Sequence, residues 1–457
     1  MARKKVYMVS GGVSKFAKSR QDRTFQAIVK ESYDYALQDL KLPAKKVHDM
    51  IDGSTASYFS DHFARQLMAG IMIQDYIGLT PKPSHRVEGG GATGGLNFQA
   101  AWKEIASESM NVCVAYGFES MSHVNTWKGN EFIALASDIS FDFPVGGFYS
   151  GYYAMMVTRH MKEFGTTPEQ LAYVSVKNHR NAMFNPYAQK PAKLTVADVR
   201  NSPMVAWPLT RLDICVMSDG AATTLLADED TAFQLSDNPI EITGIGTGTD
   251  AMRMADRPHK DVVLASNEKA EDYIGDKFQG GKLKYPGIHS FRAGRTAGNM
   301  AYKMAGITDP LKDLSFVELH DAYTSSELQT VEDLALAKYG DAGKFTESGA
   351  PFLPNIDYGL DFTGEQGTMP INPSGGLIAC GHPVGASGLM QAVFAFWQLQ
   401  GSQPRHFRAM GMDAEKAKVL QLEDPKRAAI HSHAGTGTYV SVSILERPDG
   451  QELEFRR

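Results

Sequence analysis

Cysteine is scarce in this sequence. Its 457 residues include three cysteines, Cys113, Cys215 and Cys380, which are far apart and form no CxxC pair. Scattered single cysteines exclude a disulfide framework and a zinc site built from cysteine pairs. We therefore expect a reducing, cytoplasmic location and no metal site.

Long apolar runs and an excess of basic residues are also absent. No segment has about 18 consecutive apolar residues, so no transmembrane helix is predicted. The first residues lack the apolar stretch of a signal peptide. The formal net charge is −6, which argues against a protein dedicated to nucleic acids or membrane surfaces. We expect neither kind of partner.

Short apolar runs alternate with amphipathic stretches along the chain. The length exceeds what one hydrophobic core usually spans, which predicts two packed halves. Runs rich in Val, Ile and Tyr predict strands near 5–12, 111–120, 222–230, 240–248, 315–323 and 438–446. Helical spacing predicts helices near 24–40, 299–307 and 386–401. This alternation predicts an α/β fold with a mostly parallel sheet covered on both faces.

The two halves share a faint pattern. A glycine-rich turn opens a helix at 89–105 and another opens one at 381–400. The strand in "SDGAATTLLADE" (218–229) is echoed by "AGTGTYVSVSILE" (434–446). The pattern indicates either a duplication or a chance likeness between two α/β halves. Residues 122–210 interrupt the first half and are rich in aromatics, Met and Asn, which fits either a ligand-covering insertion or an ordinary helical subdomain.

A series of motifs follows in order along nearly the whole chain. They are "VYMVSGGVSKFAKSR" (6–20), "RVEGGGATGG" (86–95), "KNHRNAMFNPYAQ" (177–189), "DICVMSDGAA" (213–222), "ELHDAYTSSEL" (318–328), "NPSGGLIACGHPVGASG" (372–388) and "IHSHAGTG" (430–437). In this order they resemble the thiolase superfamily, and specifically its sterol-carrier-protein type, which includes acetyl-CoA acetyltransferase-like enzymes.

The resemblance implies a duplicated five-layer αβαβα fold with an inserted loop domain. The N-terminal half would comprise residues 1–121 and 211–235, the loop domain over the CoA site 122–210, and the C-terminal half 236–457. It also implies a homodimer and an acyl-CoA substrate, with coenzyme A as part of the substrate and no separate cofactor.

In that family a cysteine at the start of a buried helix becomes acylated, and a second cysteine acts as acid and base. Matched residue by residue, the nucleophile position here is Gly91. The second cysteine is also missing, because its two usual positions hold Ala322 and His431. A glycine has no side chain to acylate, so covalent catalysis at this position is excluded.

Other parts of the family's machinery are retained. His382 and His320 match the groups that stabilise the enolate oxygen. Backbone N–H groups at Gly91 and in the His433–Gly435 turn match the second oxyanion site. Three further groups complete the candidates: His431, Tyr323 as an acid or base in place of the family's Phe, and the loop-domain pair Asn185 and Pro186 at the substrate. Cys113, Cys215 and Cys380 are expected to be packing residues.

Three functions compete on these residues. The first is thiolase-type acyl transfer, which the missing cysteines disfavour. The second is a retro-aldol cleavage of a 3-hydroxyacyl-CoA, which needs a base and an oxyanion site but no nucleophile, with a small OB-fold/zinc-ribbon partner. The third is a non-catalytic CoA-binding subunit of a complex. We expect an enzyme acting on the Cα–Cβ bond of a CoA thioester, and the aromatic stretch 141–157 would suit a bulky apolar acyl group.

Overall fold

The computed structural model describes residues 4–257, 263–269, 288–290 and 292–456. The strands of its main sheet are β1 (Val6–Val13), β2 (Gly53–Ser57), β3 (Ser84–Val87), β4 (Val112–Ser120), β7 (Asp219–Asp228), β8 (Ile240–Thr249), β9 (Phe316–Glu318), β10 (Arg427–Ala434) and β11 (Tyr439–Glu446). A short hairpin of β5 (Met204–Ala206) and β6 (Leu209–Thr210) lies apart from it.

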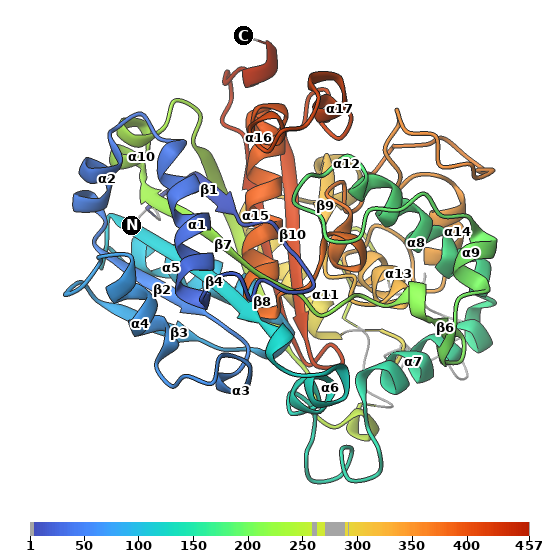
Figure 1. The fold of residues 1–457 in the computed structure, drawn as a ribbon. Coiled ribbons are helices and arrows are strands. Elements are labelled where there is room, and N and C mark those ends of the chain that lie inside the picture. The colour runs from blue at the N-terminus through green and yellow to red at the C-terminus, as the bar shows by residue number, and fades with distance from the viewer. Residues whose placement is uncertain (1–3, 258–262, 270–287, 291, 457) are drawn as a thin grey trace.

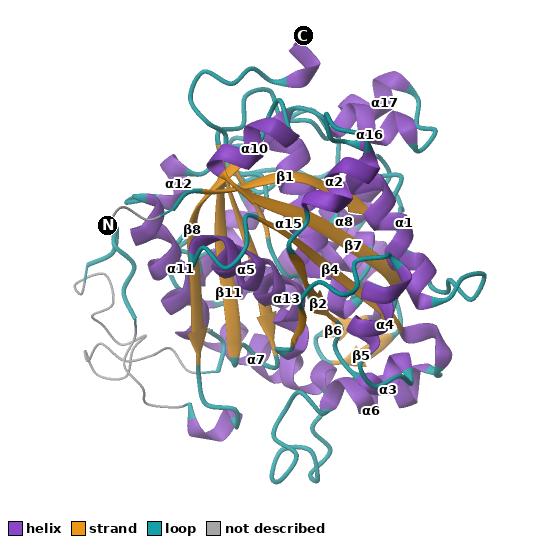
Figure 2. Ribbon diagram, turned by 90° about the vertical axis from the view of Figure 1, so that its left-hand side faces the viewer, coloured by secondary structure: helices purple, strands orange, loops and turns teal. Residues whose placement is uncertain are grey.

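Helices cover both faces of this sheet (Figures 1 and 2). Those of the first half are α1 (Phe25–Gln38), α2 (Ala44–Met50), α3 (Asp61–Ala64), α4 (Ala69–Tyr76), α5 (Thr93–Ala106), α6 (Thr126–Ala134), α7 (Tyr149–Phe164), α8 (Pro168–Ala182), α9 (Val196–Arg200) and α10 (Glu229–Leu235). Those of the second half are α11 (Arg292–Ala305), α12 (Pro310–Asp313), α13 (Thr324–Asp333), α14 (Ala342–Glu347), α15 (Val384–Gln400), α16 (Gln403–Ala409) and α17 (Ala414–Lys418). No helix within the described ranges is both long and apolar enough to cross a bilayer.

The predicted strands and helices are all present. The strand predicted at 315–323 is shorter than expected, because β9 ends at Glu318 and the next residues form a loop. The prediction of a mostly parallel sheet is wrong: among the described strands of the main sheet, five of the eight neighbouring pairs are antiparallel. The reason is that β4–β7 and β10–β11 are antiparallel neighbours, which alternation of strands and helices does not reveal.

Strand order confirms the internal duplication. The sheet runs β3-β2-β4-β7-β1-β8-β11-β10-β9. Read outward from its centre, β1, β7, β4 and β2 of the first half correspond to β8, β11, β10 and β9 of the second, with the same parallel and antiparallel pairings. The bridge between Val317 and Ile371 even occupies the place that β3 has beside β2. Chance likeness between unrelated halves does not produce this correspondence.

The two half-sheets enclose a central layer of two helices. Helices α5 and α15 contact each other and strands of both halves, whereas α1 packs on β1 and β7 and α11 packs on β8 and β11. The layers therefore follow the αβαβα order that the family resemblance predicted. In Figure 1 α15 stands upright near the middle of the molecule. All 17 of its residues are buried, as expected for a helix that is apolar on every side.

Glycines set the distance between the two central helices. A Cβ on Gly94 would lie 2.7 Å from the backbone nitrogen of Gly388, and a Cβ on Gly388 would lie 2.1 Å from that of Gly95. The backbones are thus too close for any side chain at these contacts. The second glycine pair of "GGGATGG" serves helix packing, and it brings the N-terminal ends of α5 and α15 together.

Candidate active site

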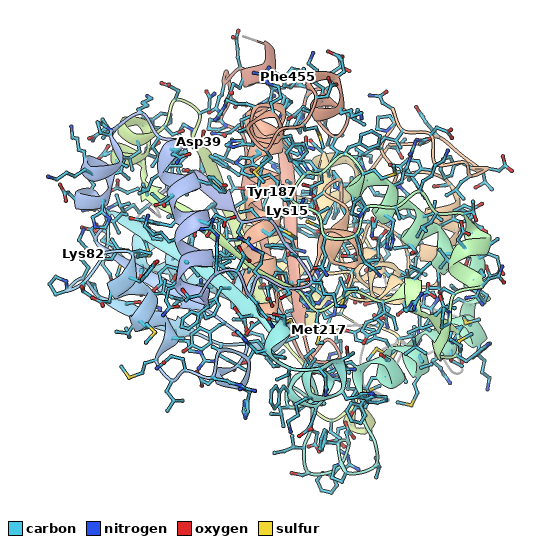
Figure 3. All side chains as sticks on the ribbon, viewed as in Figure 1. Lys15, Asp39, Lys82, Tyr187, Met217 and Phe455 are labelled. Atoms are coloured by element: carbon cyan, nitrogen blue, oxygen red, sulfur yellow. The ribbon has the colours of Figure 1, made fainter. Side chains whose placement is uncertain are left out.

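A cavity of about 1,860 Å³ lies where the two halves meet the 122–210 insertion. It exceeds the roughly 300–1,000 Å³ of ordinary small-ligand pockets. Figure 3 labels two lining residues, Lys15 and Met217, near the middle of the view. Of the residues predicted from sequence, the lining includes Gly91, His320, Tyr323, His382, His433 and Gly435.

The duplicated fold explains how these residues meet. His320 and Tyr323 follow the end of β9, and His433 lies near the end of β10, the parallel neighbour of β9. Parallel strands place their carboxyl ends on the same edge of a sheet, where ligands usually bind. Gly91 and His382 lie just before the helices α5 and α15. The cavity is therefore bordered by two helix N-terminal ends, which favour developing negative charge.

Gly91 has no room for a side chain. A Cβ at this position would lie 2.6 Å from the carbonyl oxygen of His433 and 3.3 Å from Cε1 of His320. The nearer atom belongs to the backbone of β10 and cannot rotate away. In this structure a side chain at residue 91, the predicted nucleophile position, would therefore require the backbone at His433 to shift.

One thiol does line the cavity, although the sequence pattern predicted a packing role for it. Cys215 lies beside Ala322, whose carbonyl oxygen accepts the Cys215 N–H at 2.9 Å. Burial raises the pKa of the Cys215 thiol to about 12, so the group is a neutral thiol at neutral pH. Cys113 and Cys380 are fully buried and are not among the lining residues.

Four histidines gather at this end of the sheet. The ring centroid of His320 lies 4.9 Å from that of His382 and 4.2 Å from that of His433, and the rings of His431 and His433 are 5.5 Å apart. Burial lowers the pKa of His382 to about 4 and that of His431 to about 3. It lowers the pKa of His320 and His433 well below 6.5, and the neighbouring imidazoles lower it further. All four are neutral at neutral pH.

The hydrogen bonds of His382 assign its tautomer. Its Nδ1 lies 2.7 Å from Oγ of Ser387, and that hydroxyl donates to the carbonyl oxygen of Pro383 at 2.9 Å. The hydroxyl then has a lone pair for Nδ1–H, which leaves Nε2 with a lone pair of its own. A neutral imidazole in this form is a base at Nε2. His382 is therefore better placed to accept a proton than to donate to an enolate oxygen, the role predicted from sequence.

A buried carboxyl group fixes the turn that carries His382. Glu119, at the end of β4, accepts hydrogen bonds from the N–H groups of Phe59 (2.8 Å) and Gly385 (3.0 Å). Burial raises the pKa of Glu119 to about 8, although these two hydrogen bonds lower it. The turn between Gly381 and α15 is thus tied to the first half-sheet.

His431 lies behind the cavity and does not line it. Its Nδ1 accepts the backbone N–H of His320 at 3.4 Å. Within the described residues its Nε2 has no hydrogen-bond partner. The structure places His431 as a support for the loop that carries His320.

Tyr323 and a second tyrosine form one wall of the cavity. The ring of Tyr323 stacks on that of Tyr153 with centroids 4.2 Å apart, and its hydroxyl lies 3.3 Å from Oγ of Ser150. The hydroxyl of Tyr153 lies 2.6 Å from Nε2 of His433. In the sequence Tyr153 stands out only as part of the aromatic stretch 141–157, because no local motif shows that α7 meets β10.

Asn185 and Pro186 lie outside the cavity lining. The amide of Asn185 donates to the carbonyl oxygen of Ser374 at 2.9 Å, and its oxygen accepts the N–H of Tyr187 at 3.0 Å. The first of these bonds joins the insertion to the turn before Gly376–Cys380. A direct role of the pair in substrate binding stays a prediction.

Cationic side chains surround part of the cavity. Lys15, Lys18, Lys190 and Arg211 are among the lining residues. Burial lowers the pKa of Lys190, and the charge of Arg211 lowers it further. Ammonium and guanidinium groups at this rim suit a ligand that carries phosphates.

Comparisons with known proteins agree with this architecture. The family models for the thiolase N-terminal domain and the thiolase C-terminal domain-like region match residues 6–201 and 284–447. Acetyl-CoA acetyltransferase of Methanothermobacter thermautotrophicus is 34% identical over 93% of this chain and 95% of its own length. Sterol carrier protein 2 of Bos taurus is 29% identical over 87% of this chain and 67% of its length. The solved Ltp2-ChsH2(DUF35) aldolase has a similar fold, with a TM-score of 0.72 at 21% identity over 97% of this chain and 98% of that one.

Proposed function

The chain belongs to the thiolase family of acyl-CoA enzymes, and on this premise we propose that it cleaves the Cα–Cβ bond of a 3-hydroxyacyl-CoA by a retro-aldol reaction without an acyl-enzyme. The observation that supports this proposal most strongly is the closed space at Gly91, where a Cβ would lie 2.6 Å from a backbone oxygen. Acyl transfer needs a nucleophile at the helix start, and a retro-aldol reaction does not.

The groups around the cavity fit the two needs of a retro-aldol reaction. A base must remove the proton of the substrate hydroxyl, and Nε2 of His382 carries the lone pair for this. The C–C bonding electrons then move onto the thioester as its enolate, while the hydroxyl carbon becomes a carbonyl. Donors for the enolate oxygen would come from His320 and from the N–H of Gly91, since the first amides of a helix lack partners within the helix.

The cavity also fits a large CoA thioester. The cationic rim suits the phosphates of CoA, as described above. The lining also includes the aromatic side chains of Phe16, Phe59, Phe148 and Tyr149. We propose that the substrate carries a bulky, apolar group on Cβ, the hydroxyl carbon that becomes the carbonyl of the released product.

Acyl transfer is the second candidate, and Cys215 is the observation in its favour. This thiol lines the same cavity, so it is the group that could accept an acyl chain. Its raised pKa, about 12, works against this role because the thiolate is the nucleophile.

We propose two kinds of partner. A solved aldolase of this fold carries a DUF35 component in its name, which supports the small OB-fold/zinc-ribbon subunit expected here. Trp127, Phe141 and Val145 are 83%, 57% and 85% exposed and lie in the insertion that borders the cavity, where such a subunit could dock. For a homodimer, the exposed Leu67 and Met68 (72% and 69%) precede α4, which packs beside the edge strand β3. We also propose a cytoplasmic location.

A pair of matched probes tests the reaction. The full chain is incubated with 3-hydroxy-3-phenylpropionyl-CoA, or with 3-oxo-3-phenylpropionyl-CoA plus CoA, and products are identified by mass spectrometry. Benzaldehyde and acetyl-CoA from the first probe are expected. Benzoyl-CoA from the second probe alone would establish acyl transfer instead. Tight binding of both probes with no product, in the presence of a purified partner subunit, would establish a non-catalytic role.

A further inference from the structure

We propose that Tyr153 is a catalytic acid–base residue that, paired with His433, moves the proton to and from Cα of the thioester enolate. This inference deepens the proposed function and rests on it. Cleavage leaves a carbanion equivalent at Cα that must take up a proton. In this chain both usual positions of the second cysteine are empty, at Ala322 and His431, so another group must supply this proton.

The geometry of Tyr153 distinguishes it from the other cavity tyrosines. Its hydroxyl forms a 2.6 Å hydrogen bond with Nε2 of His433 and lies 3.2 Å from the carbonyl oxygen of Gly435. Tyr153, His433 and Gly435 all line the cavity. A phenol paired directly with an imidazole at the substrate has a partner that can take and return its proton.

The neighbouring Tyr323 holds the ring of Tyr153 in place. The two rings are stacked with centroids 4.2 Å apart and planes inclined by 18°. The hydroxyl of Tyr323 points elsewhere, since its partner is Oγ of Ser150 at 3.3 Å. Ala322 directly precedes Tyr323, so the phenol of Tyr153 reaches the region that the missing thiol of the family would serve.

A buried arginine adds positive potential behind this pair. Arg257 is fully buried, and its guanidinium donates to the carbonyl oxygen of Ala251 (2.9 Å) and to the hydroxyls of Thr436 (2.9 Å) and Thr438 (3.0 Å). It also donates to the carbonyl oxygen of Thr436. Within the described residues, all these acceptors are neutral. Burial raises the pKa of Tyr153 well above 10, and the charge of Arg257 opposes that rise, so a transient phenolate costs less than it would by burial alone.

The proton transfers balance in both directions. On release of product, the O–H bond of Tyr153 breaks and a C–H bond forms at Cα with the electron pair of the enolate. His382 has gained the substrate's hydroxyl proton and Tyr153 has lost its own. Exchange with solvent therefore removes one proton from His382 and returns one to Tyr153. The phenolate of Tyr153 regains a proton from solvent through His433. In the reverse direction the Tyr153 proton leaves through His433 to solvent, and the phenolate oxygen then takes a proton from Cα.

Exchange of Cα protons isolates this step. Acetyl-CoA and propionyl-CoA are incubated with the full chain in D₂O, and deuterium at Cα is followed by mass spectrometry, with no C–C bond being cleaved. Tyr153→Phe keeps the stacked ring and removes the hydroxyl. We expect it to slow exchange by about 10²- to 10⁴-fold, the usual contribution of a positioned acid or base. Tyr323→Phe should slow it by less than about tenfold.

Tyr152→Phe is the matched control. It removes a hydroxyl from the adjacent residue of α7, which is buried but does not line the cavity, and exchange should be unchanged. If Tyr153→Phe exchanges Cα protons at a rate within threefold of that of the unaltered chain, the role of Tyr153 is overturned and the proposed function is unaffected. No exchange by the unaltered chain with either thioester would overturn both. The melting temperature of each variant shows whether it still folds. His433→Gln breaks the same pair from its other side and should also slow exchange, which separates loss of the proton transfer from loss of folding.

Discussion

The carbonyl oxygen of His433 occupies the space beside Gly91, 2.6 Å from where a Cβ on residue 91 would lie. The contact joins the start of α5 to the end of β10, two segments that come from different halves of the duplicated fold. The predicted absence of a nucleophile therefore involves the backbone of β10 as well as the identity of residue 91. A thiol cannot be restored there without moving His433.

The first prediction concerns this contact. Gly91→Ala and Gly91→Cys should each lower the free energy of unfolding by about 1–3 kcal/mol, because an added group in a filled space displaces its surroundings. Both should also reduce retro-aldol activity by displacing His433, and Gly91→Cys should not gain thiolysis. The measurements are thermal melting and product analysis with the two phenylpropionyl-CoA probes.

Gly151→Ala is the control for the added methyl group. A Cβ on Gly151 meets nothing within 4 Å, and this residue lies inside α7. Alanine is favoured over glycine in a helix by about 0.5–1 kcal/mol, so this variant should melt at the same temperature or higher. Efficient thiolysis by Gly91→Cys would show that the loop opens readily.

The second prediction concerns the thiol in the cavity. With its pKa raised to about 12, Cys215 should react slowly with iodoacetamide at neutral pH. Activity should survive the treatment, and Cys215→Ser should keep activity within about threefold of the unaltered chain, since a surface or wall substitution without a chemical role has small effects. Intact-protein mass spectrometry after mixing with acyl-CoA should show no covalent acyl adduct. An adduct on Cys215 would favour acyl transfer.

The third prediction concerns the base. His382→Ala should reduce kcat by about 10²- to 10⁴-fold. Ser387→Ala leaves the imidazole in place but removes the partner that fixes Nδ1–H. It should therefore lower kcat by a smaller factor and leave KM nearly unchanged. Steady-state kinetics with the hydroxyacyl probe distinguish the two effects, and an equal loss for both variants would indicate that the turn itself has collapsed.

The fourth prediction is a loss of stability in mild acid. The folded-state pKa is about 4 for His382 and about 3 for His431, below the ordinary 6.5. As the pH falls below 6.5, the unfolded chain binds protons at these histidines that the folded chain does not, so they decrease the free energy of unfolding. Glu119, whose folded-state pKa is raised to about 8, contributes in the opposite direction. The slope is about 1.4 kcal/mol per pH unit for each such histidine, and it continues until the folded-state pKa is reached.

Urea unfolding between pH 7.5 and 5 measures this slope. His431→Gln removes one of these groups behind the cavity, so its stability should depend less steeply on pH. His123→Asn, an exposed position, serves as the control and should leave the slope unchanged. An equally steep profile for His431→Gln and the unaltered chain would show that His431 is protonated in the folded state.

Much of the fold could be predicted from the sequence. The strand and helix patterns located β1, β4, β7, β8 and β11 and the helices α1 and α15, because these elements are long and their residues are periodic. The edge strand β3 and its neighbour β2 were missed because they are short and contain few of the usual strand residues. The antiparallel pairs were missed because strand direction depends on partners that lie far apart in the chain.

Part of the candidate site could also be predicted from local sequence patterns. Motif order located Gly91, His320, His382 and His433, and the structure brings all four to one cavity. Cys215 and Tyr153 were not recognised as cavity residues, since Tyr153 depends on a contact of the insertion with the second half of the fold, and Cys215 on a contact of the first half with the second.

The sequence by itself determined that this chain has a thiolase-type fold, and it predicts that cysteine is missing from the positions where that chemistry needs it, because motifs and residue identities are local. Only the tertiary structure decided that the space at Gly91 is closed, that His382 presents a bare Nε2, and that Tyr153 pairs with His433. These depend on distances between β10, α7 and the central helices, which are set by packing across the whole molecule and not by any one stretch of residues.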